Sequence, residues 1–342
     1  MAKSYPRRNQ ASGIWKLSDI TFNIINYGTF PNAGTKGVFA GGQTPSDSDI
    51  IDYITISSTG DAADFGDLSG AKKRGGSGSS FTRTLFGGGY PSTNVVEYIT
   101  PSSLGNAADF GDLTAATGAC GGFSNQIRFV NFGGGAPGYT DAMDYFTIAS
   151  AGDATDFGNL STAQTSGAGS ASPTRGIAAG GFASPADAMS NAIDYFTIAS
   201  AGNATDFGNL AAAIETMQWA SSNTRAVSAG GATAPSNNNE VNTLQTIIFA
   251  TTGNTIDYGD LTGTVWYGTS ASDGKRGIHA GGRRHPVSQV NIIDYYSLTS
   301  AGNAADFGDL TAARILCYSG SNGPGHGGLE AFDSRPFPCC NI

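Results

Sequence analysis

The motif Asp-Phe-Gly-Asp-Leu occurs six times in this chain, and the other features repeat around it. Three copies carry one substitution each, at Asn159, Asn209 and Tyr258. The copies begin at Asp64, Asp109, Asp156, Asp206, Asp257 and Asp306, 45 to 51 residues apart. This period is typical of four-stranded β-propeller blades and is too long for leucine-rich, ankyrin or tetratricopeptide repeats. The 342 residues are therefore predicted to form one closed array of blades rather than two unrelated domains.

Each repeat shows the same succession of strands and turns. A strand ends in a glycine pair such as Gly41-Gly42, and a variable loop follows it. The next strand alternates aromatic and β-branched residues, as in Ile193 to Ile198, and turns through Ser-x-Gly-Asp or Ser-x-Gly-Asn. The return strand carries the motif. The 19 or 20 residues between the motif leucine and the next glycine pair leave room for a fourth strand.

The first repeat lacks that fourth strand, whereas residues 315–319 follow the last motif without a blade of their own. We therefore predict that this C-terminal strand completes the first blade and closes the ring, which removes its exposed edges. The fold class is all-β, with six four-stranded blades. Seven blades are the alternative, because residues 325–328 imitate one more strand end. The expected domains are an N-terminal segment 1–34, a propeller 35–320 and a tail 321–342.

The motif itself is expected to hold neighbouring blades together. Its aromatic residue, Phe157 for example, should wedge between two sheets. Its aspartates are expected to accept backbone hydrogen bonds at strand ends, a role that Asn159 and Asn209 could fill equally well.

Composition excludes several partners. The net charge of −9 argues against nucleic acid, because that affinity rests on clustered Lys and Arg. Neither an apolar run of membrane-spanning length nor a signal-peptide core is present, so we expect no membrane insertion and synthesis in a cytoplasm. Cys120, Cys317, Cys339 and Cys340 form no C-x-x-C pair, which favours reduced thiols over a zinc site or a disulfide framework.

No catalytic constellation stands out in the sequence. The three histidines suggest no Ser-His-Asp set, and no glycosidase carboxylate pair is discernible, so we do not predict an enzyme. We also predict no cofactor and no metal site. Calcium is the alternative, because hard oxygen ligands cluster in two places. These clusters are Asp61, Asp64 and Asp67, and Asp47, Asp49 and Asp52.

Two regions are candidates for binding. The loops after the glycine pairs differ between blades, and a closed propeller presents such loops on one face. Their aromatic and basic residues could stack on sugars or pair with anions. These candidates are Tyr90, Tyr139, Phe182, Arg283, Arg284 and His285. In the N-terminal segment, Trp15, Leu17 and Ile20 form a short apolar stretch that either plugs the array or docks on another protein.

The repeat resembles kelch repeats in its glycine pair, its tyrosine-bearing strand, its motif aromatic and an occasional following arginine, Arg74 or Arg314. The run from Ile193 to Leu210 more closely resembles repeats of structural and tail-fibre-like proteins of tailed bacteriophages of marine and cyanobacterial hosts. The Gly13 to Leu17 stretch is similar to a segment that precedes those repeats. The fifth repeat departs from the pattern, with Gln245-Thr246 in place of Asp-Tyr.

This resemblance implies a kelch-like propeller and a non-enzymatic virion protein, in a tail fibre or a surface decoration. Such a protein would bind other virion proteins, in multiple copies per particle, and could attach to a host surface glycan. A carbohydrate-binding receptor-recognition propeller is the alternative, and a glycan-active enzyme is a more distant one. The expected location is the virion.

Overall fold

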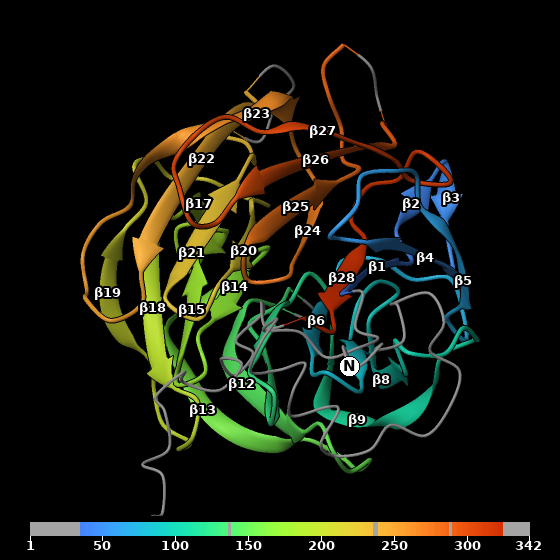
Figure 1. The fold of residues 1–342 in the computed structure, drawn as a ribbon. Helices are drawn as coiled ribbons and strands as arrows, with labels where there is room; N and C mark the ends of the chain where they lie inside the picture. Colours follow the sequence, from blue (N-terminus) through green and yellow to red (C-terminus); the bar gives the residue numbers. More distant parts are fainter. Residues whose placement is uncertain (1–34, 136–137, 235–238, 287–288, 324–342) are drawn as a thin grey trace, which may run out of the picture. The chain divides into compact units, whose positions relative to one another are not determined.

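The computed structural model describes residues 35–323, except 136–137, 235–238 and 287–288. These residues form strands and turns without a helix, in six antiparallel blades arranged as a β-propeller (Figure 1). No helix that could span a membrane is found among them. The predicted six-bladed, all-β fold is therefore confirmed.

Each blade has four strands, ordered from the propeller axis outwards. The innermost strands are β28 (Tyr318–Ser321), β6 (Gly76–Ser79), β10 (Gly121–Ser124), β14 (Ala168–Ala171), β20 (Gln218–Ser221) and β24 (Thr269–Ser272). The second strands are β1 (Lys36–Ala40), β7 (Thr84–Gly87), β11 (Arg128–Phe132), β15 (Arg175–Ala179), β21 (Arg225–Ala229) and β25 (Arg276–Ala280).

The third strands are β4 (Ile50–Thr55), β8 (Thr93–Ile99), β12 (Thr140–Thr147), β18 (Ala192–Thr197), β22 (Val241–Ile248) and β26 (Ile292–Ser297). The outer strands carry the motif and are β5 (Ala63–Asp67), β9 (Ala108–Thr117), β13 (Thr155–Thr165), β19 (Thr205–Asn209), β23 (Ile256–Val265) and β27 (Ala305–Asp309). Two short hairpins, β2–β3 (Gln43–Thr44, Ser46–Asp47) and β16–β17 (Phe182–Ala183, Ala188–Met189), lie in the loops after glycine pairs.

The ring closes as the sequence predicts. Strand β28 pairs antiparallel with β1, with Ala40 opposite Tyr318 and Gly37 opposite Ser321. The C-terminal strand thus supplies the innermost strand of the first blade. It begins at Tyr318, a few residues later than the predicted stretch, because Leu316 and Cys317 belong to the turn that leads into it.

The motif aromatics do wedge between blades. Phe157 is 1% exposed and packs against Tyr145 of its own blade and Phe196 of the next, with ring centroids 5.9 and 6.3 Å away. Equivalent clusters surround Phe65, Phe110, Phe207, Tyr258 and Phe307. Each such burial stabilises the fold by on the order of 4 kcal/mol before entropy is counted.

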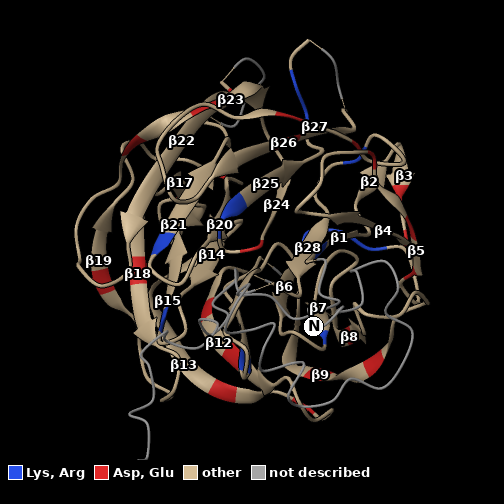
Figure 2. Ribbon diagram, viewed as in Figure 1, with Lys and Arg blue, Asp and Glu red and all other residues tan. Residues whose placement is uncertain are grey.

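The expectation that the motif aspartates accept the hydrogen bonds is wrong. The hairpin turn of each blade lies against the outer strand of the preceding blade, and the acceptor side chain belongs to the turn. Asp153 Oδ1, for example, accepts from the Asp112 N–H at 3.1 Å. The other acceptors are Asp61, Asn106, Asn203, Asn254 and Asn303. The acidic residues of the outer strands instead mark the rim of the propeller (Figure 2).

The contact between the outer strand of one blade and the hairpin turn of the next, here called the seam, also explains the motif glycine. Gly66 has φ +146°, and a Cβ there would lie 2.6 Å from the Gly105 backbone of the next blade. The Gly105 N–H donates to the Phe65 carbonyl at 2.9 Å, and the Ala107 N–H donates to the Asp67 carbonyl at 2.7 Å. Only glycine lets two backbones approach this closely.

A second inter-blade contact comes from the third strands. A buried acidic or amide residue there binds the residue after the preceding motif; Asp194, for instance, accepts from Ser161 N at 2.9 Å. These residues are Asp52, Glu97, Asp144, Asp194, Gln245 and Asp294. Three of them pair with a cation: Lys72 with Glu97, Arg314 with Asp52 and Arg284 with Asp294.

The divergent fifth repeat keeps its packing through compensating changes. Gln245 Oε1 accepts from Ala211 N and Thr255 Oγ1, as the acids of other blades accept from the preceding motif. Thr246 replaces the tyrosine over which four other blades place an arginine and the first blade places Lys36. Here Arg225 lies 5.1 Å from the ring of Tyr258 and donates to its hydroxyl at 3.0 Å, so the motif tyrosine substitutes for the missing one.

Candidate ligand-binding site at the mouth of the central channel

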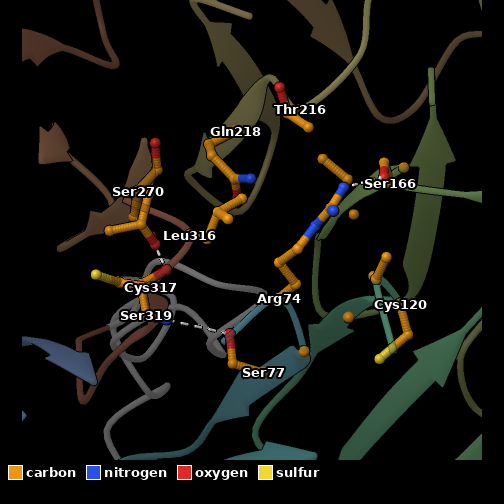
Figure 3. A pocket seen from close by; sticks show the side chains of 18 of the residues that line it. Arg74, Ser77, Cys120, Ser166, Thr216, Gln218, Ser270, Leu316, Cys317 and Ser319 are labelled. Carbon is orange, nitrogen blue, oxygen red and sulfur yellow. Dashed lines mark hydrogen bonds between the residues drawn. The ribbon is translucent and has the colours of Figure 1, made fainter. Parts of the chain in front are cut away.

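The six innermost strands surround a narrow central channel. Successive inner strands contact one another around the axis, and small residues, mainly Gly and Ser, line the space (Figure 3). The cavity within it measures about 90 Å³. Ser319 ties three blades together, because its Oγ donates to the Ser270 carbonyl at 2.6 Å and its N–H donates to Ser77 Oγ at 3.4 Å.

A ring of six equivalent residues forms the mouth of this channel. Each lies two positions before an inner strand and has the left-handed backbone conformation, with φ between 52° and 63°. The six are Arg74, Ala119, Ser166, Thr216, Tyr267 and Leu316. None is glycine, although this conformation costs an ordinary residue about 1–2 kcal/mol. Strain of this kind is commonly retained where a backbone shape serves a binding site.

Backbone hydrogen bonds join five of the six neighbouring pairs in this ring head to tail. The N–H groups of Ala119 and Ser166 each donate to the carbonyl of the preceding ring residue at 2.8 Å, and Arg74 N donates to Leu316 O at 3.1 Å. Thr216 N bonds Ser166 O at 3.4 Å, and Leu316 N bonds Tyr267 O at 2.8 Å. These bonds keep the backbone conformation similar at the six positions, whereas the six side chains differ. The side chains can therefore provide different contacts to a ligand from similar backbone positions.

A second layer of residues lies just outside the ring. The residue before each ring position lies beside the residue after a glycine pair. These neighbours form Lys73–Tyr90, Thr165–Phe182, Glu215–Ala232 and Trp266–Arg283 pairs, and Gln43–Ile315 in the first blade. The variable loops and the ring therefore form one continuous surface at the end of the channel where the inner strands begin.

A recess of about 320 Å³ opens at this surface. Five aromatic side chains line it, and they come from four different blades. They are Tyr90, Tyr139, Phe182, Trp266 and Tyr267. The remaining lining residues are Arg74, Ala119, Gly135, Thr165, Ser166 and Glu215. The recess thus joins broad aromatic surfaces to one cation and one acid, a combination typical of ligand sites.

Arg74 reaches across the mouth from one blade towards others (Figure 3). Its guanidinium lies 5.8 Å from the ring centres of both Tyr90 and Tyr267, within cation–π range. Its Nη2 donates to Ser166 Oγ at 3.0 Å. The position of the charge is therefore fixed by two rings and one hydroxyl.

Glu215 is a buried acid in the wall of the same recess, only 3% exposed. Burial raises its pKa to about 7, although the attraction of Arg74 opposes that rise. Two further polar atoms nearby, Trp266 Nε1 and Thr216 Oγ1, are buried and without a hydrogen-bond partner among the described residues. Unpaired buried polar atoms cost about 1–3 kcal/mol each.

Tyrosines of the recess are held in their neutral form. The Tyr139 hydroxyl donates to Asp187 Oδ1 at 2.5 Å, and this bond raises the pKa of Tyr139 to about 12. Burial raises the pKa of Tyr267 to about 12 as well, and its ring stacks on Trp266 at 4.0 Å. Both phenols remain hydrogen-bond donors and stacking surfaces at neutral pH.

Sequence-predicted site residues divide into three groups. Tyr90, Tyr139 and Phe182 come together in the recess as neighbouring walls. Arg283 lies behind that wall, 6.0 Å from the Trp266 ring centre. Arg284 points away and pairs with the buried Asp294 at 2.7 Å, and His285 is exposed on the loop outside the recess.

The candidate docking residues Trp15, Leu17 and Ile20 lie outside the described residues, as do Cys339 and Cys340. Cys120 and Cys317 are free thiols beside the channel, and burial raises the pKa of each. No group of three or more acidic, His or Cys residues that could hold a metal ion is found in the described part of the chain. Of the aspartates considered for calcium, Asp52 is bound by Arg314 and Asp47 by Lys73.

The ring residues Ser166, Thr216 and Tyr267, and the acid Glu215, were not predicted from the sequence. A constant spacing could have revealed the ring, because each member lies six residues after a motif leucine. Arg74 has this position, whereas Arg314 lies four residues after its leucine and binds Asp52. The two arginines that look alike in the sequence therefore have different roles.

No protein-family model matches the chain, and the comparison with curated proteins finds no match.

Proposed function

We propose that this protein is a non-enzymatic binding propeller that recognises a carbohydrate in the recess at the channel mouth. The observation that carries the proposal is the recess itself, in which five aromatic side chains lie beside one cation and one acid, Arg74 and Glu215. A sugar has apolar C–H faces that stack on aromatic rings and hydroxyls that both donate and accept. Arg74 would donate to such hydroxyls, and Glu215 would accept from them or donate to them.

The composition of the recess favours binding over hydrolysis. Glycoside hydrolysis usually requires two carboxylates that flank the scissile bond. Glu215 is the one carboxylate among the described residues that line the recess. Retention of the sugar without cleavage is therefore the expected outcome.

The points where the chain enters and leaves the propeller lie away from the recess. The chain enters the propeller at Thr35 and leaves it at Gly323, and these residues lie side by side. Strand β1 runs from there towards its glycine pair, and β28 runs back, so both ends lie on the face opposite the mouth. An attachment at this face would leave the recess open.

The resemblance of the repeats to phage structural and tail-fibre-like proteins supports a place for this binding in a virion. We propose that the protein is a tail-fibre or surface-decoration component of a tailed phage. It would bind other virion proteins through the segment that contains Trp15, and a host glycan through the recess. If the binding test detects no glycan, the protein would instead have a purely structural role in the virion.

A glycan array with the purified protein tests the binding directly. Wild-type protein should bind a defined set of saccharides, and Tyr267→Ala should lose about tenfold in affinity, since a stacked ring contributes about 1.5 kcal/mol. Phe81→Ala is the matched control, because Phe81 is 49% exposed in the turn at the other end of β6. Equal losses in both variants, or no bound saccharide at all, would contradict the proposal.

A further inference from the structure

Arg74 lines the recess without a fixed anionic or carbonyl partner among the described residues. Several arginines lie over a tyrosine and donate to a carbonyl of the next blade. These are Arg83, Arg128, Arg175 and Arg276. Other cations pair with a carboxylate, namely Lys72, Lys73, Arg284 and Arg314.

The side chain of Arg74, by contrast, donates one hydrogen bond to Ser166, and no carboxylate of the described residues lies within ion-pair distance. A guanidinium carries five N–H groups in a planar fork that fits a carboxylate. Tyr90 and Tyr267 hold this fork in place at the recess, so little entropy is lost when an anion binds.

We infer that the sugar bound in the recess carries a carboxylate, which pairs with Arg74, and that Glu215 takes up a proton when this sugar binds. This inference rests on the proposed carbohydrate binding and specifies its ligand class. The residues of the recess suit such a ligand: the guanidinium of Arg74 pairs with the acid group, aromatic rings such as Tyr267 stack on the sugar, and protonated Glu215 donates to one of its oxygens.

Proton uptake follows from the charges around Glu215. Its carboxylate is buried, and its pKa is about 7 in the free protein, where the Arg74 charge already lowers it. Two other titratable groups interact electrostatically with Glu215. They are Tyr139, whose hydroxyl binds Asp187, and Tyr267, which also interacts with the charge of Arg283. The negative charge of a ligand carboxylate would offset the positive charge of Arg74, so the pKa of Glu215 would rise further on binding.

The direction of the pH dependence separates an acidic ligand from a neutral one. If binding of an acidic sugar raises the pKa of Glu215 by about one unit, affinity falls about fivefold between about pH 6 and about pH 8. A neutral sugar would leave the charge of Arg74 in place, and ionised Glu215 would accept its hydroxyls more strongly. Affinity for a neutral sugar would therefore stay level or rise over the same range.

The experiment begins with an array that presents uronic-acid and sialic-acid saccharides beside their neutral counterparts. Titration calorimetry then follows the strongest hit at about pH 6 and about pH 8. We expect acidic hits, the stated fall with pH, and loss of that pH dependence in Glu215→Gln. Arg74→Gln should weaken binding at least about tenfold, as loss of a charge-assisted pair predicts. The neighbouring Lys73→Gln, which removes a cation already paired with Asp47, should change affinity less than about twofold.

The outcomes are distinguishable. Binding of neutral saccharides without preference for acidic ones would overturn this inference and leave the proposed function intact. Binding of an acidic saccharide with no change between the two pH values would overturn the role of Glu215. An array without any hit would overturn the proposed function itself. Denaturant unfolding of each variant would confirm that a lost interaction does not reflect a lost fold.

Discussion

The closing seam of the ring offers a strong test of how this propeller is held together. Arg314 and Asp52 are both fully buried where the last motif meets the first blade. Arg314 Nη2 donates to Asp52 Oδ2 at 2.5 Å, and its Nη1 donates to the carbonyls of Gly41 and Ile50 at 3.0 and 2.8 Å. Asp52 also accepts from Thr311 Oγ1 at 2.7 Å.

Arg314→Ile should therefore be strongly destabilising. It leaves the Asp52 carboxylate buried without its counter-ion, and the loss of one partner of a buried pair costs about 3–5 kcal/mol. Equilibrium unfolding in guanidinium chloride, followed by tryptophan fluorescence, measures that loss. Lys73→Ile is the comparison, because the Lys73–Asp47 pair is 21% and 30% exposed and should contribute less than about 1 kcal/mol.

The chain itself provides the compensating variant. At the seam before the fifth blade, Ile214 occupies the position equivalent to Arg314, and the neutral Gln245 replaces the acid. Arg314→Ile combined with Asp52→Gln should thus recover most of the lost stability. A single variant that loses less than about 1 kcal/mol, or a double variant no more stable than the single one, would refute the reasoning.

Three further predictions follow from the seams and the recess. Gly66→Ala should cost about 1–3 kcal/mol more than Gly105→Ala, since both have similar positive φ but only the Cβ at Gly66 meets a neighbouring backbone; equal losses in thermal unfolding would contradict this. Phe157→Ala should lose about 3–5 kcal/mol while leaving glycan binding at the mouth unchanged in protein that remains folded, because its contacts lie in a seam between blades. Wild-type stability should fall as pH rises from the ordinary Glu pKa of 4.5 through about 7, since the raised pKa of Glu215 stabilises the fold only while the group is protonated. Glu215→Gln should remove about 1–3 kcal/mol of that fall in urea unfolding between about pH 5 and about pH 8, and parallel pH profiles would show that the acid is not buried as described.

Most of the scaffold could be predicted from the sequence because each blade is specified by a short sequence pattern that repeats along the chain. The spacing of the motif gives the blades, and the unpaired strand after the last motif gives the closure. The role of the motif glycine could not be predicted, because the backbone that it meets belongs to the next blade. The same holds for the turn acceptors such as Asp153, which bind across a seam rather than within their own strand.

The recess was only partly predictable for a related reason. Aromatic loop residues such as Tyr90 stand out by type, and the structure brings them together. The ring positions do not stand out, because Thr216 and Tyr267 adopt a backbone conformation that sequence reasoning assigns to glycine. The pKa of Glu215 is raised by burial in the folded protein, and the order of residues along the chain does not predict that burial. Arg283 and Arg284 are adjacent and chemically alike, yet only one of them lies near the recess.

The pairing of β28 with β1 has a consequence for how the protein is made. A ribosome synthesises β28 after all the other strands of the described residues, so the first blade stays incomplete until β28 has been made. During that time β1 presents an unpaired edge, which is a template for pairing with another nascent chain. Neighbouring chains on one polysome could then exchange their last strands and form swapped dimers. Rapid pairing of β28 with β1 would shorten the time for which this edge is exposed.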